Sequence, residues 1–335
     1  MILAGGLSTR LYPLTKQVPK PLVPVAGVPN AAHLLRYLKA YGIDEVAMNV
    51  HYRAEAITAA LGDGSQFGVK IHYAHETELL GSAGAVKNIQ PFFGDDSFVV
   101  IGCDEVTDMR LDQLLEFHRE RGAIASIALV ECDDVEHYGV VMLDADAKIV
   151  GFQEKPPKGT ERSKLANTGV YVFSPEIFER IPAGEFYDFG NQVFPALQTA
   201  GERFYGFEAS GAYWADIGTP REYRRASYDV VQGVVQIPET RPNGVDPSAI
   251  VDRSARIEGA VRLGAGVRIA GGVSIEGPCI IDDRVRIEEG ARLTRAIVWQ
   301  GATIGARARL SDTVVGAGYA VDAESVLNGA LVAPE

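Results

Sequence analysis

The stretch from residue 1 to residue 30 combines residue types that suit phosphate binding. A short apolar run ends at Ala4 and is followed by Gly5 and Gly6, then by Arg10, and later by Lys20 between two prolines. Glycines let backbone N–H groups turn towards an anion, while a guanidinium and an ammonium group neutralise its charge. The flanking prolines present the lysine from a stiff segment. We therefore predict a phosphate-binding loop, with Ala4, Gly5 and Gly6 lining the substrate site.

This loop differs from the common nucleotide-binding loops. It lacks the Gly-Lys-Ser/Thr ending of a P-loop, and Gly5-Gly6 does not begin a complete dinucleotide G-x-G-x-x-G motif. A plain strand-to-helix turn is the alternative interpretation, but it leaves Arg10, Lys20 and the prolines unexplained. Phosphate binding accounts for all of them.

Two aspartates near the ends of expected strands are further candidates. The apolar stretch from Phe98 leads into an acidic cluster that contains Asp104, and open α/β sheets bind ligands beyond the carboxyl ends of their strands. Asp216 lies between Trp214 and Ile217, and an extended backbone would turn it away from those apolar side chains. Read singly, Asp104 could cap the next helix and Asp216 could occupy a turn. Asp104 is the first candidate metal ligand, and Asp216 is the second acid.

Three segments between these aspartates carry groups that suit a sugar. Gly139, Glu154 and Asn167 offer backbone and side-chain donors and acceptors for the hydroxyl groups of a hexose. Lys155 can pair with a phosphate on that sugar. Taken alone, Glu154 and Lys155 would more often form an ordinary exposed ion pair. The chemistry of these groups makes all four residues candidates for substrate binding.

Strand-like and helix-like patterns alternate through residues 1–235, which is typical of an α/β fold with a parallel sheet. We expect strands at 2–4, 45–50, 69–73 and from 98, and helices at 30–41, 53–61 and 83–89. Most of the candidate residues fall at the ends of these elements or between them. The sequence therefore predicts a Rossmann-like domain with a mixed or parallel sheet whose loops carry the substrate site.

Residues 249–335 repeat with a period of six. One apolar row is formed by Val251, Ile257, Leu263, Ile269, Ile275, Ile281, Ile287 and Leu293, with a companion row two residues earlier. After one slip the repeat resumes at Val298. Hexapeptide repetition is typical of a parallel β-helix in which each repeat forms one side of a triangular coil. We predict a left-handed parallel β-helix of about four coils, preceded by a linker at 236–248.

This β-helix segment carries no histidine, since all six histidines of the chain lie before residue 140. Acyltransferases with such repeats need a catalytic base, which is commonly histidine, so a second, acyl-transferring activity is not expected. Structural support, allosteric control or oligomerisation fits better. Exposed coil ends are natural protein-contact surfaces, and we predict a homo-oligomer formed through this segment.

Length, charge and cysteines narrow the class of protein. The 335 residues are enough for two domains, and a net charge of -12 argues against a nucleic-acid-binding surface. The three cysteines show neither metal-binding nor disulfide spacing, which indicates a reducing compartment. The opening apolar run is too short for a signal peptide, and no 18-residue apolar span follows. We expect a cytoplasmic protein that contacts neither nucleic acid nor a membrane; the nearness of Met1 to Gly5 leaves open a native start upstream.

The loop motifs together resemble those of the sugar-1-phosphate nucleotidyltransferases. The first stretch is similar to G-G-x-G-T-R-L-x-P-L-T followed by P-K-P, with Ser8 where most members carry glycine. The acidic cluster resembles N-G-D-x-x-x-D, with Gly102-Cys103 in place of Asn-Gly, and the later aspartate stands in W-x-D-I-G-T-P. Segments similar to Y-G-V, F-x-E-K-P and N-x-G-x-Y lie between them. The resemblance covers nearly the whole chain and is closest to the mannose-1-phosphate guanylyltransferases.

The resemblance implies that a sugar phosphate attacks the α-phosphorus of a nucleoside triphosphate and releases pyrophosphate. It implies catalytic roles for Arg10, which would stabilise the pyrophosphate, and for Lys20, which with Lys155 would pair with the approaching phosphates. It also implies that Asp104 and Asp216 share Mg²⁺, an ion that needs only one or two carboxylates beside phosphate and water. These charged groups would position and neutralise two polyanions.

The resemblance further implies that the turn at Gly81 lies over the nucleobase and that Glu76, five residues earlier, reads the base edge. A carboxylate only accepts hydrogen bonds, which suits the paired N1–H and N2–H donors of guanine, whereas the mixed edge of uracil or thymine suits an amide. We therefore predict GTP and mannose-1-phosphate as substrates. Glu78 could take this role instead of Glu76. A glucose-1-phosphate uridylyl- or thymidylyltransferase and a catalytically silent, NDP-sugar-binding regulatory subunit are the alternatives.

Overall fold

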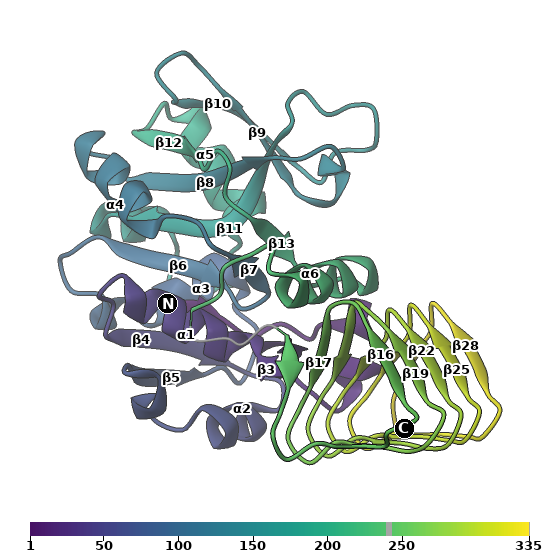
Figure 1. Ribbon diagram of the computed structural model, residues 1–335. Helices are drawn as coiled ribbons and strands as arrows, with labels where there is room; N and C mark the ends of the chain where they lie inside the picture. The colour runs from purple at the N-terminus through teal and green to yellow at the C-terminus, as the bar shows by residue number, and fades with distance from the viewer. Residues whose placement is uncertain (239–242, 335) are drawn as a thin grey trace. The chain divides into compact units, whose positions relative to one another are not determined.

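The computed structural model describes residues 1–238 and 243–334 (Figure 1). The predicted linker at 236–248 includes residues 239–242, which lie outside the described residues. The chain forms two compact units, Met1–Gly6 with Leu34–Ala215 and Leu7–His33 with Asp216–Glu335. Within the described ranges, every helix is too short or too polar to span a membrane.

A nine-stranded mixed sheet forms the centre of the first unit. Leu3, in the first strand, lies opposite Asn49 of one neighbouring strand and Gly102 of the other. The four parallel strands follow the order β6-β1-β4-β5 and comprise β1 (Ile2–Leu3), β4 (Glu45–Val50), β5 (Lys70–His75) and β6 (Phe98–Gly102). Because parallel strands end at the same edge, the loops that follow them start side by side.

The other half of the sheet is mainly antiparallel. It begins with β11, which runs antiparallel to β6, and comprises β8 (Ala125–Glu131), β9 (Gly139–Leu143), β10 (Ile149–Glu154), β11 (Leu165–Phe173) and β12 (Phe204–Glu208). A separate two-stranded sheet contains β7 (Glu105–Thr107) and β13 (Trp214–Asp216). The predicted Rossmann-like fold with a mixed sheet is confirmed.

The first three helices of this fold lie close to the predicted ranges 30–41, 53–61 and 83–89, whereas the fourth and fifth were not predicted. In chain order these five helices are α1 (Asn30–Ala40), α2 (Ala54–Leu61), α3 (Gly81–Asn88), α4 (Leu111–Glu120) and α5 (Phe194–Thr199). In the core of the first unit, the rings of Phe173 and Phe189 stack at 4.8 Å, and those of Phe189 and Phe194 at 5.5 Å. Stacked aromatic rings bury much apolar area in a fixed geometry, so they anchor the strand and loop ends that surround them.

The second unit contains a parallel β-helix built from three sheets of six, five and five strands. The first sheet holds β14 (Gly244–Val245), β17 (Val261–Leu263), β20 (Cys279–Ile281), β23 (Ile297–Val298), β26 (Val314–Val315) and β29 (Leu331–Val332). The second holds β15 (Ile250–Val251), β18 (Arg268–Ile269), β21 (Arg286–Ile287), β24 (Thr303–Ile304) and β27 (Ala320–Val321). The third holds β16 (Arg256–Glu258), β19 (Ser274–Glu276), β22 (Arg292–Thr294), β25 (Arg309–Ser311) and β28 (Val326–Asn328), stacked side by side in Figure 1.

The coils of this β-helix follow the sequence repeat. Arg262 pairs with Ile280, 18 residues on, whereas Ile280 pairs with Ile297, 17 residues on, which is the slip in the repeat. The predicted parallel β-helix is confirmed, and its left hand stays a prediction. The number of coils was wrong: the sheets of five strands make five coils, not about four. Pairing begins at Gly244 and extends to Val332, beyond the apolar rows on which that number rested.

The second unit also contains the helix α6 (Pro220–Gln232) and the segment 7–33. The hydroxyl of Thr219 accepts from the N–H of Glu222 at 3.3 Å, and Gly233 ends the helix with a φ of 76°. These caps fix where α6 starts and stops. The segment 7–33 forms the turns η1 (Thr9–Leu11), η2 (Leu14–Lys16) and η3 (Lys20–Leu22) and a hairpin of β2 (Pro24–Val25) and β3 (Val28–Pro29).

Candidate active site

A pocket of about 240 Å³ opens at the carboxyl edge of the parallel strands in the first unit. Its wall consists of Leu3, Gly5, Gly6, Asn49, Glu76, Leu79, Gly81, Ser82 and Phe186. Four of these residues were predicted to bind substrate, namely Gly5, Gly6, Glu76 and Gly81. The loop after β1, the segment after β5 and the start of α3 therefore meet around one hollow.

The two glycines after β1 serve this pocket in different ways. A Cβ atom at Gly5 would lie 2.7 Å from Asn49 Nδ2 and 3.0 Å from Glu76 Oε2, so a side chain there would displace the pocket wall. A Cβ atom at Gly6 would meet no other atom within 4 Å. The first glycine is thus required for packing, whereas the second leaves the backbone open to close approach by a ligand.

Asn49 connects the loop after β1 to Glu76. Its Oδ1 accepts a hydrogen bond from the backbone N–H of Ala4 at 2.9 Å, and its Nδ2 donates to Glu76 Oε1 at 3.3 Å. The backbone carbonyl of Glu76 also lies 2.8 Å from Nδ1 of His51. Asn49 was not predicted from the sequence, although a lone amide in the apolar strand 45–50 is a signal that could have found it.

The Glu76 side chain is the acidic group of this pocket. It is only 8% exposed, and burial raises the pKa of its carboxyl, while the hydrogen bond from Asn49 and the charge of His51 act in the opposite direction. Glu78, the competing candidate, is exposed and does not line the pocket. Of the two acids considered from the sequence, Glu76 is therefore the one placed to meet a ligand.

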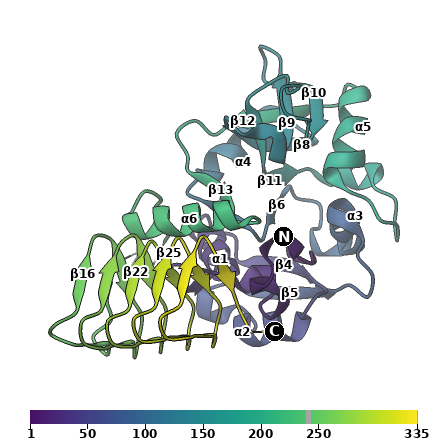
Figure 2. The same cartoon turned by 90° about the vertical axis from the view of Figure 1, so that its right-hand side faces the viewer.

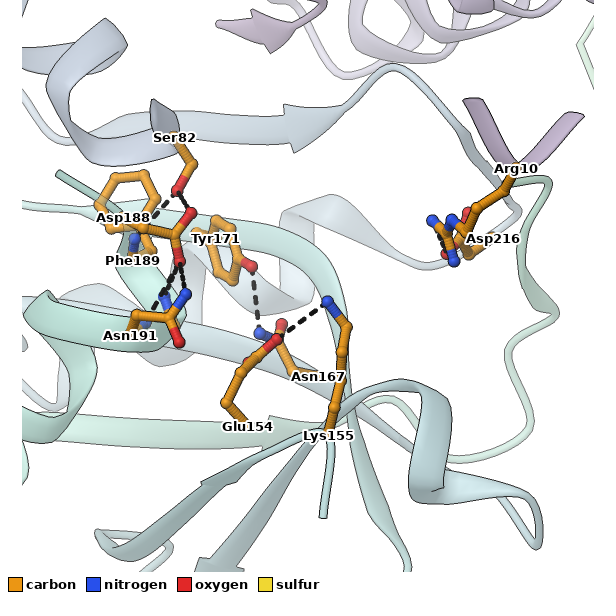
Figure 3. A network of polar contacts seen from close by, with 11 residues as sticks. Arg10, Ser82, Glu154, Lys155, Asn167, Tyr171, Asp188, Phe189, Asn191 and Asp216 are labelled. Atoms are coloured by element: carbon orange, nitrogen blue, oxygen red, sulfur yellow. Dashed lines mark hydrogen bonds and ion pairs between the residues drawn. The ribbon is translucent and has the colours of Figure 1, made fainter. Parts of the chain in front are cut away.

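The start of α3 closes the pocket through backbone geometry. Gly81 has a φ of 73°, and a Cβ atom there would lie 2.5 Å from the backbone oxygen of Tyr187, so only glycine fits. Ser82 Oγ donates to Asp188 Oδ2 at 2.8 Å, and Figure 3 shows the Asp188 carboxylate between Ser82 and Asn191. Ser82 and Asp188 were not predicted, because no local pattern links residues 106 positions apart.

The predicted sugar-binding residues also gather in the first unit. A Cβ atom at Gly139 would lie 3.2 Å from Glu154 Oε2, and one at Gly190 would lie 2.6 Å from it, so the carboxylate rests against two glycine backbones. Glu154 Oε1 lies 3.2 Å from Lys155 Nζ, and Figure 3 shows both side chains close to Asn167. The Lys155 side chain is 62% exposed, so this ion pair stabilises the fold little and leaves the ammonium accessible.

Asp104 lies in the turn between β6 and β7. The next helix, α4, begins only at Leu111, so Asp104 does not cap it. A Cβ atom at Gly102 would lie 2.9 Å from Asp104 Oδ1, which places the carboxylate over the end of β6. The following residue, Glu105, is buried and accepts a hydrogen bond from Trp214 Nε1 at 2.6 Å. Glu105 was not singled out from the sequence, and its contact holds the indole in the core.

Within the second unit, Arg10 and Lys20 converge on Asp216. Arg10 Nη2 lies 3.8 Å from Asp216 Oδ2, and Lys20 Nζ lies 4.0 Å from Asp216 Oδ1. A Cβ atom at Gly218 would lie 2.6 Å from Arg10 Nη2 and 2.7 Å from Asp216 Oδ1 (Figure 3 shows this arginine and aspartate). The N–H of Gly218 donates to Asp216 Oδ1 at 2.6 Å. Three of the charged groups predicted from the sequence therefore surround one notch.

Comparison with protein families identifies both parts of the chain. A family model described as nucleotidyl transferase matches residues 1–233. The chain belongs to the nucleotidyl transferase family. A second family model, described as the GMPPB C-terminal domain, matches residues 240–335.

Relatives of this nucleotidyl transferase agree on the reaction class. The chain is 39% identical to a UTP–glucose-1-phosphate uridylyltransferase from Synechocystis, over 96% of this chain and 88% of the relative. It is 37% identical to a mannose-1-phosphate guanylyltransferase from Mycobacterium tuberculosis, over 72% and 67% of the two chains. A crystal structure described as a glucose-1-phosphate thymidylyltransferase from Bacillus anthracis has a TM-score of 0.61 and 28% identity, covering 68% of this chain and 92% of that one. Their names differ in the nucleotide and the sugar.

A nucleotidyl transferase must bind substrates with several negatively charged phosphate groups. A divalent cation held by carboxylates can neutralise part of this charge, so we asked whether the acids of this chain fit such an ion. Among residues 1–238 and 243–334, no group of three or more His, Cys, Asp or Glu side chains could hold a metal ion. Mg²⁺, however, needs only one or two carboxylates and takes its remaining ligands from phosphate and water. Asp104, in the first unit, and Asp216, in the second, each offer such oxygens, and a glycine two residues away, Gly102 or Gly218, keeps side-chain atoms from that carboxylate. Their chemistry therefore fits Mg²⁺.

Proposed function

We propose that this nucleotidyl transferase joins GTP to mannose-1-phosphate and forms GDP-mannose and pyrophosphate. The observation that carries the proposal is the buried carboxylate of Glu76 in the pocket wall beside Gly5. A carboxylate offers only acceptors, which match the adjacent N1–H and N2–H donors of guanine. Asn49 donates to Oε1 of Glu76, and Oε2 faces Gly5. This orientation supports recognition of guanine by the acid.

The reaction needs positioning and charge neutralisation, because a phosphate monoester is already an ionised nucleophile at neutral pH. An oxygen of the sugar phosphate forms a bond to the α-phosphorus of GTP. The bond from that phosphorus to the oxygen bridging the α- and β-phosphates breaks, and pyrophosphate leaves with the electron pair. In this proposal Arg10 and Lys20 neutralise phosphate oxygens, while Lys155 holds the phosphate of the sugar. Glu154 and Asn167 bind sugar hydroxyl groups.

We also propose that the reaction depends on Mg²⁺ held by Asp104 and Asp216. When bound, the ion would neutralise phosphate charge. The support is the donor set, since Mg²⁺ prefers oxygen ligands and needs few from the protein. Titration of activity with MgCl₂ and chelation with EDTA test this dependence, and full activity in EDTA would refute it.

A glucose-1-phosphate uridylyltransferase is the second candidate, and one observation favours it. The relative with that name is 39% identical and aligns with 96% of this chain. The two candidates therefore differ in both the nucleobase and the sugar that the chain accepts.

A substrate panel separates these candidates. The purified chain is incubated with each of GTP, UTP and dTTP together with mannose-1-phosphate or glucose-1-phosphate, and released pyrophosphate is measured. We expect the highest kcat/KM with GTP and mannose-1-phosphate. A preference for UTP or dTTP would refute guanine recognition, and binding of an NDP-sugar without turnover of any pair would indicate a silent regulatory subunit.

Two further predictions concern the oligomeric state and the cellular location of the enzyme. We propose a homo-oligomer formed through the β-helix, supported by the exposed apolar side chains Val245, Ile250 and Val326 on its coils. Light scattering during size-exclusion chromatography tests it, and a monomer at micromolar concentration would refute it. We also propose a cytoplasmic location, supported by Cys103, Cys132 and Cys279, none of which forms a disulfide.

A further inference from the structure

One outer face of the β-helix is apolar and covered within the second unit. Side chains that point outward from such a coil normally meet solvent, yet Ile280, Ile297 and Val314 are each at most 1% exposed. They occupy matching positions on neighbouring strands of the first sheet. The helix α6 packs against this sheet, and Figure 2 shows it lying along the coils. The β-helix and α6 therefore share one buried apolar interface.

A chain of two hydrogen bonds crosses this interface to the segment that carries Lys20. Trp299 Nε1, on the β-helix, donates to Tyr223 Oη of α6 at 2.8 Å. Tyr223 Oη in turn donates to the backbone oxygen of Pro24 at 2.7 Å. Both aromatic side chains are at most 2% exposed. A buried polar group that lacks a hydrogen-bond partner destabilises the fold. The two hydrogen bonds therefore fix the position of the Pro24 carbonyl.

The fixed carbonyl lies close in the chain to the predicted phosphate-binding lysine. Lys20 begins the turn η3, whose end is closed by the N–H of Val23 donating to the Lys20 oxygen at 3.1 Å. Pro24 follows directly and begins the hairpin of β2 and β3. A shift of the Pro24 carbonyl would therefore move the backbone that presents the lysine.

The tip of the same hairpin rests on the β-helix at a second point. Gly27 has a φ of 75°, and a Cβ atom there would lie 2.7 Å from Asp282 Oδ1 and 2.8 Å from Arg262 Nε. Both of these side chains belong to the first sheet of the β-helix or its adjoining turn. The hairpin is thus held near its start by Tyr223 and at its tip by the coil.

We propose that the β-helix positions the phosphate-binding segment 7–33, with Tyr223 and Trp299 as positioning residues for Lys20 and for the notch at Asp216. The expected effect on turnover rests on the proposed function. It assigns the β-helix a role in turnover that does not require an effector or an oligomer. The geometry that carries it lies entirely within the second unit.

The test compares two tyrosines of α6. Tyr223→Phe keeps the ring and removes the hydroxyl that joins Trp299 to Pro24. Tyr228→Phe is the matched control, because the Tyr228 hydroxyl donates to the backbone oxygen of Arg295 on the β-helix and has no bond to segment 7–33. Hydrogen exchange is followed by mass spectrometry on peptides covering residues 16–29. Turnover is measured with the best substrate pair of the wild-type chain.

Tyr223→Phe should speed exchange in residues 16–29 by about tenfold, as expected for the loss of a buried hydrogen bond. It should lower kcat by about as much and leave the KM for the sugar phosphate unchanged. Trp299→Phe should act in the same direction and more weakly, and Tyr228→Phe should alter neither quantity. Equal effects of the two tyrosine variants, or unchanged exchange in Tyr223→Phe, would overturn the inference. The exchange result stands by itself if no substrate pair is turned over, so a failure of the proposed function is seen separately.

Discussion

Replacing Glu76 with glutamine is the sharpest test of how the pocket selects its nucleobase. The substitution keeps the size of the side chain and exchanges one acceptor oxygen for an NH₂ donor. Asn49 Nδ2 donates to Oε1 at 3.3 Å, so the amide oxygen of a glutamine should take that position. The new NH₂ group then occupies the place of Oε2, which lies against Gly5 in the pocket.

The expected effect follows from this orientation. With GTP, the variant loses a hydrogen bond from guanine to the charged carboxylate, and its NH₂ donor faces an N–H donor of the base. A hydrogen bond to a charged group is worth about 1.5–3 kcal/mol, so kcat/KM with GTP should fall by about 100-fold. With UTP or dTTP, the amide matches a mixed edge and kcat/KM should rise by about tenfold.

The assay measures released pyrophosphate for GTP, UTP and dTTP with wild type, Glu76→Gln and Glu78→Gln. Glu78→Gln is the matched control, because it makes the same chemical change at an exposed residue that does not line the pocket. It should leave all three values within about twofold, since surface substitutions away from a site have small effects. An unchanged ratio of GTP to UTP in Glu76→Gln, or an equal change in the control, would refute the assignment of Glu76.

Three other outcomes are expected. Gly218→Ala should lower kcat at least about tenfold with little loss of thermal stability. The new Cβ would lie 2.6 Å from Arg10 Nη2 in the notch, so it would displace charged side chains and leave the hydrophobic core intact. Turnover at the wild-type rate would contradict this prediction. Asp104→Asn and Asp216→Asn should each shift the MgCl₂ titration of activity to higher concentration, and an unshifted midpoint in both would contradict the metal assignment. Burial raises the pKa of Asp282 from 3.8 to about 7, so the folded chain holds a proton that the unfolded chain releases. Its contribution to the free energy of unfolding is therefore complete below pH 3.8 and is lost as pH rises through about 7, by as much as about 1.4 kcal/mol per pH unit. Urea unfolding of wild type and Asp282→Asn across this range should show the loss in wild type alone.

Local patterns were sufficient to predict the first parallel strands, the first three helices and the β-helix. The period of six in residues 249–335 comes from side chains that stack in every coil, so the β-helix was evident without any tertiary information. The glycines, Arg10 and Lys20 were evident because their types are uncommon together at such spacing. Glu76 was selected through the resemblance to the nucleotidyltransferases, which implied a base-reading residue five positions before Gly81, and the structure lines one pocket with both residues.

The contacts of the other residues around the pocket depend on pairing between distant parts of the chain. Asn49 reads as an interior residue of a strand, and only the parallel pairing of β1 and β4 brings it to the N–H of Ala4. Ser82 and Asp188 meet across 106 residues, so their hydrogen bond depends on the route of the chain through the fold. The choice between Glu76 and Glu78 likewise required burial, which a sequence does not contain.

The sequence by itself predicted an α/β fold, a β-helix and the chemical class of the groups proposed to bind phosphate, because periodicity and residue type are local properties. Tertiary structure alone decided which of these groups meet. Arg10 and Lys20 come together with Asp216, about two hundred positions later, and segment 7–33 forms one compact unit with α6 and the β-helix. The physical reason is that some side chains are buried only where elements far apart in the chain pack together. Such side chains here are Ile280, Ile297, Tyr223 and Trp299.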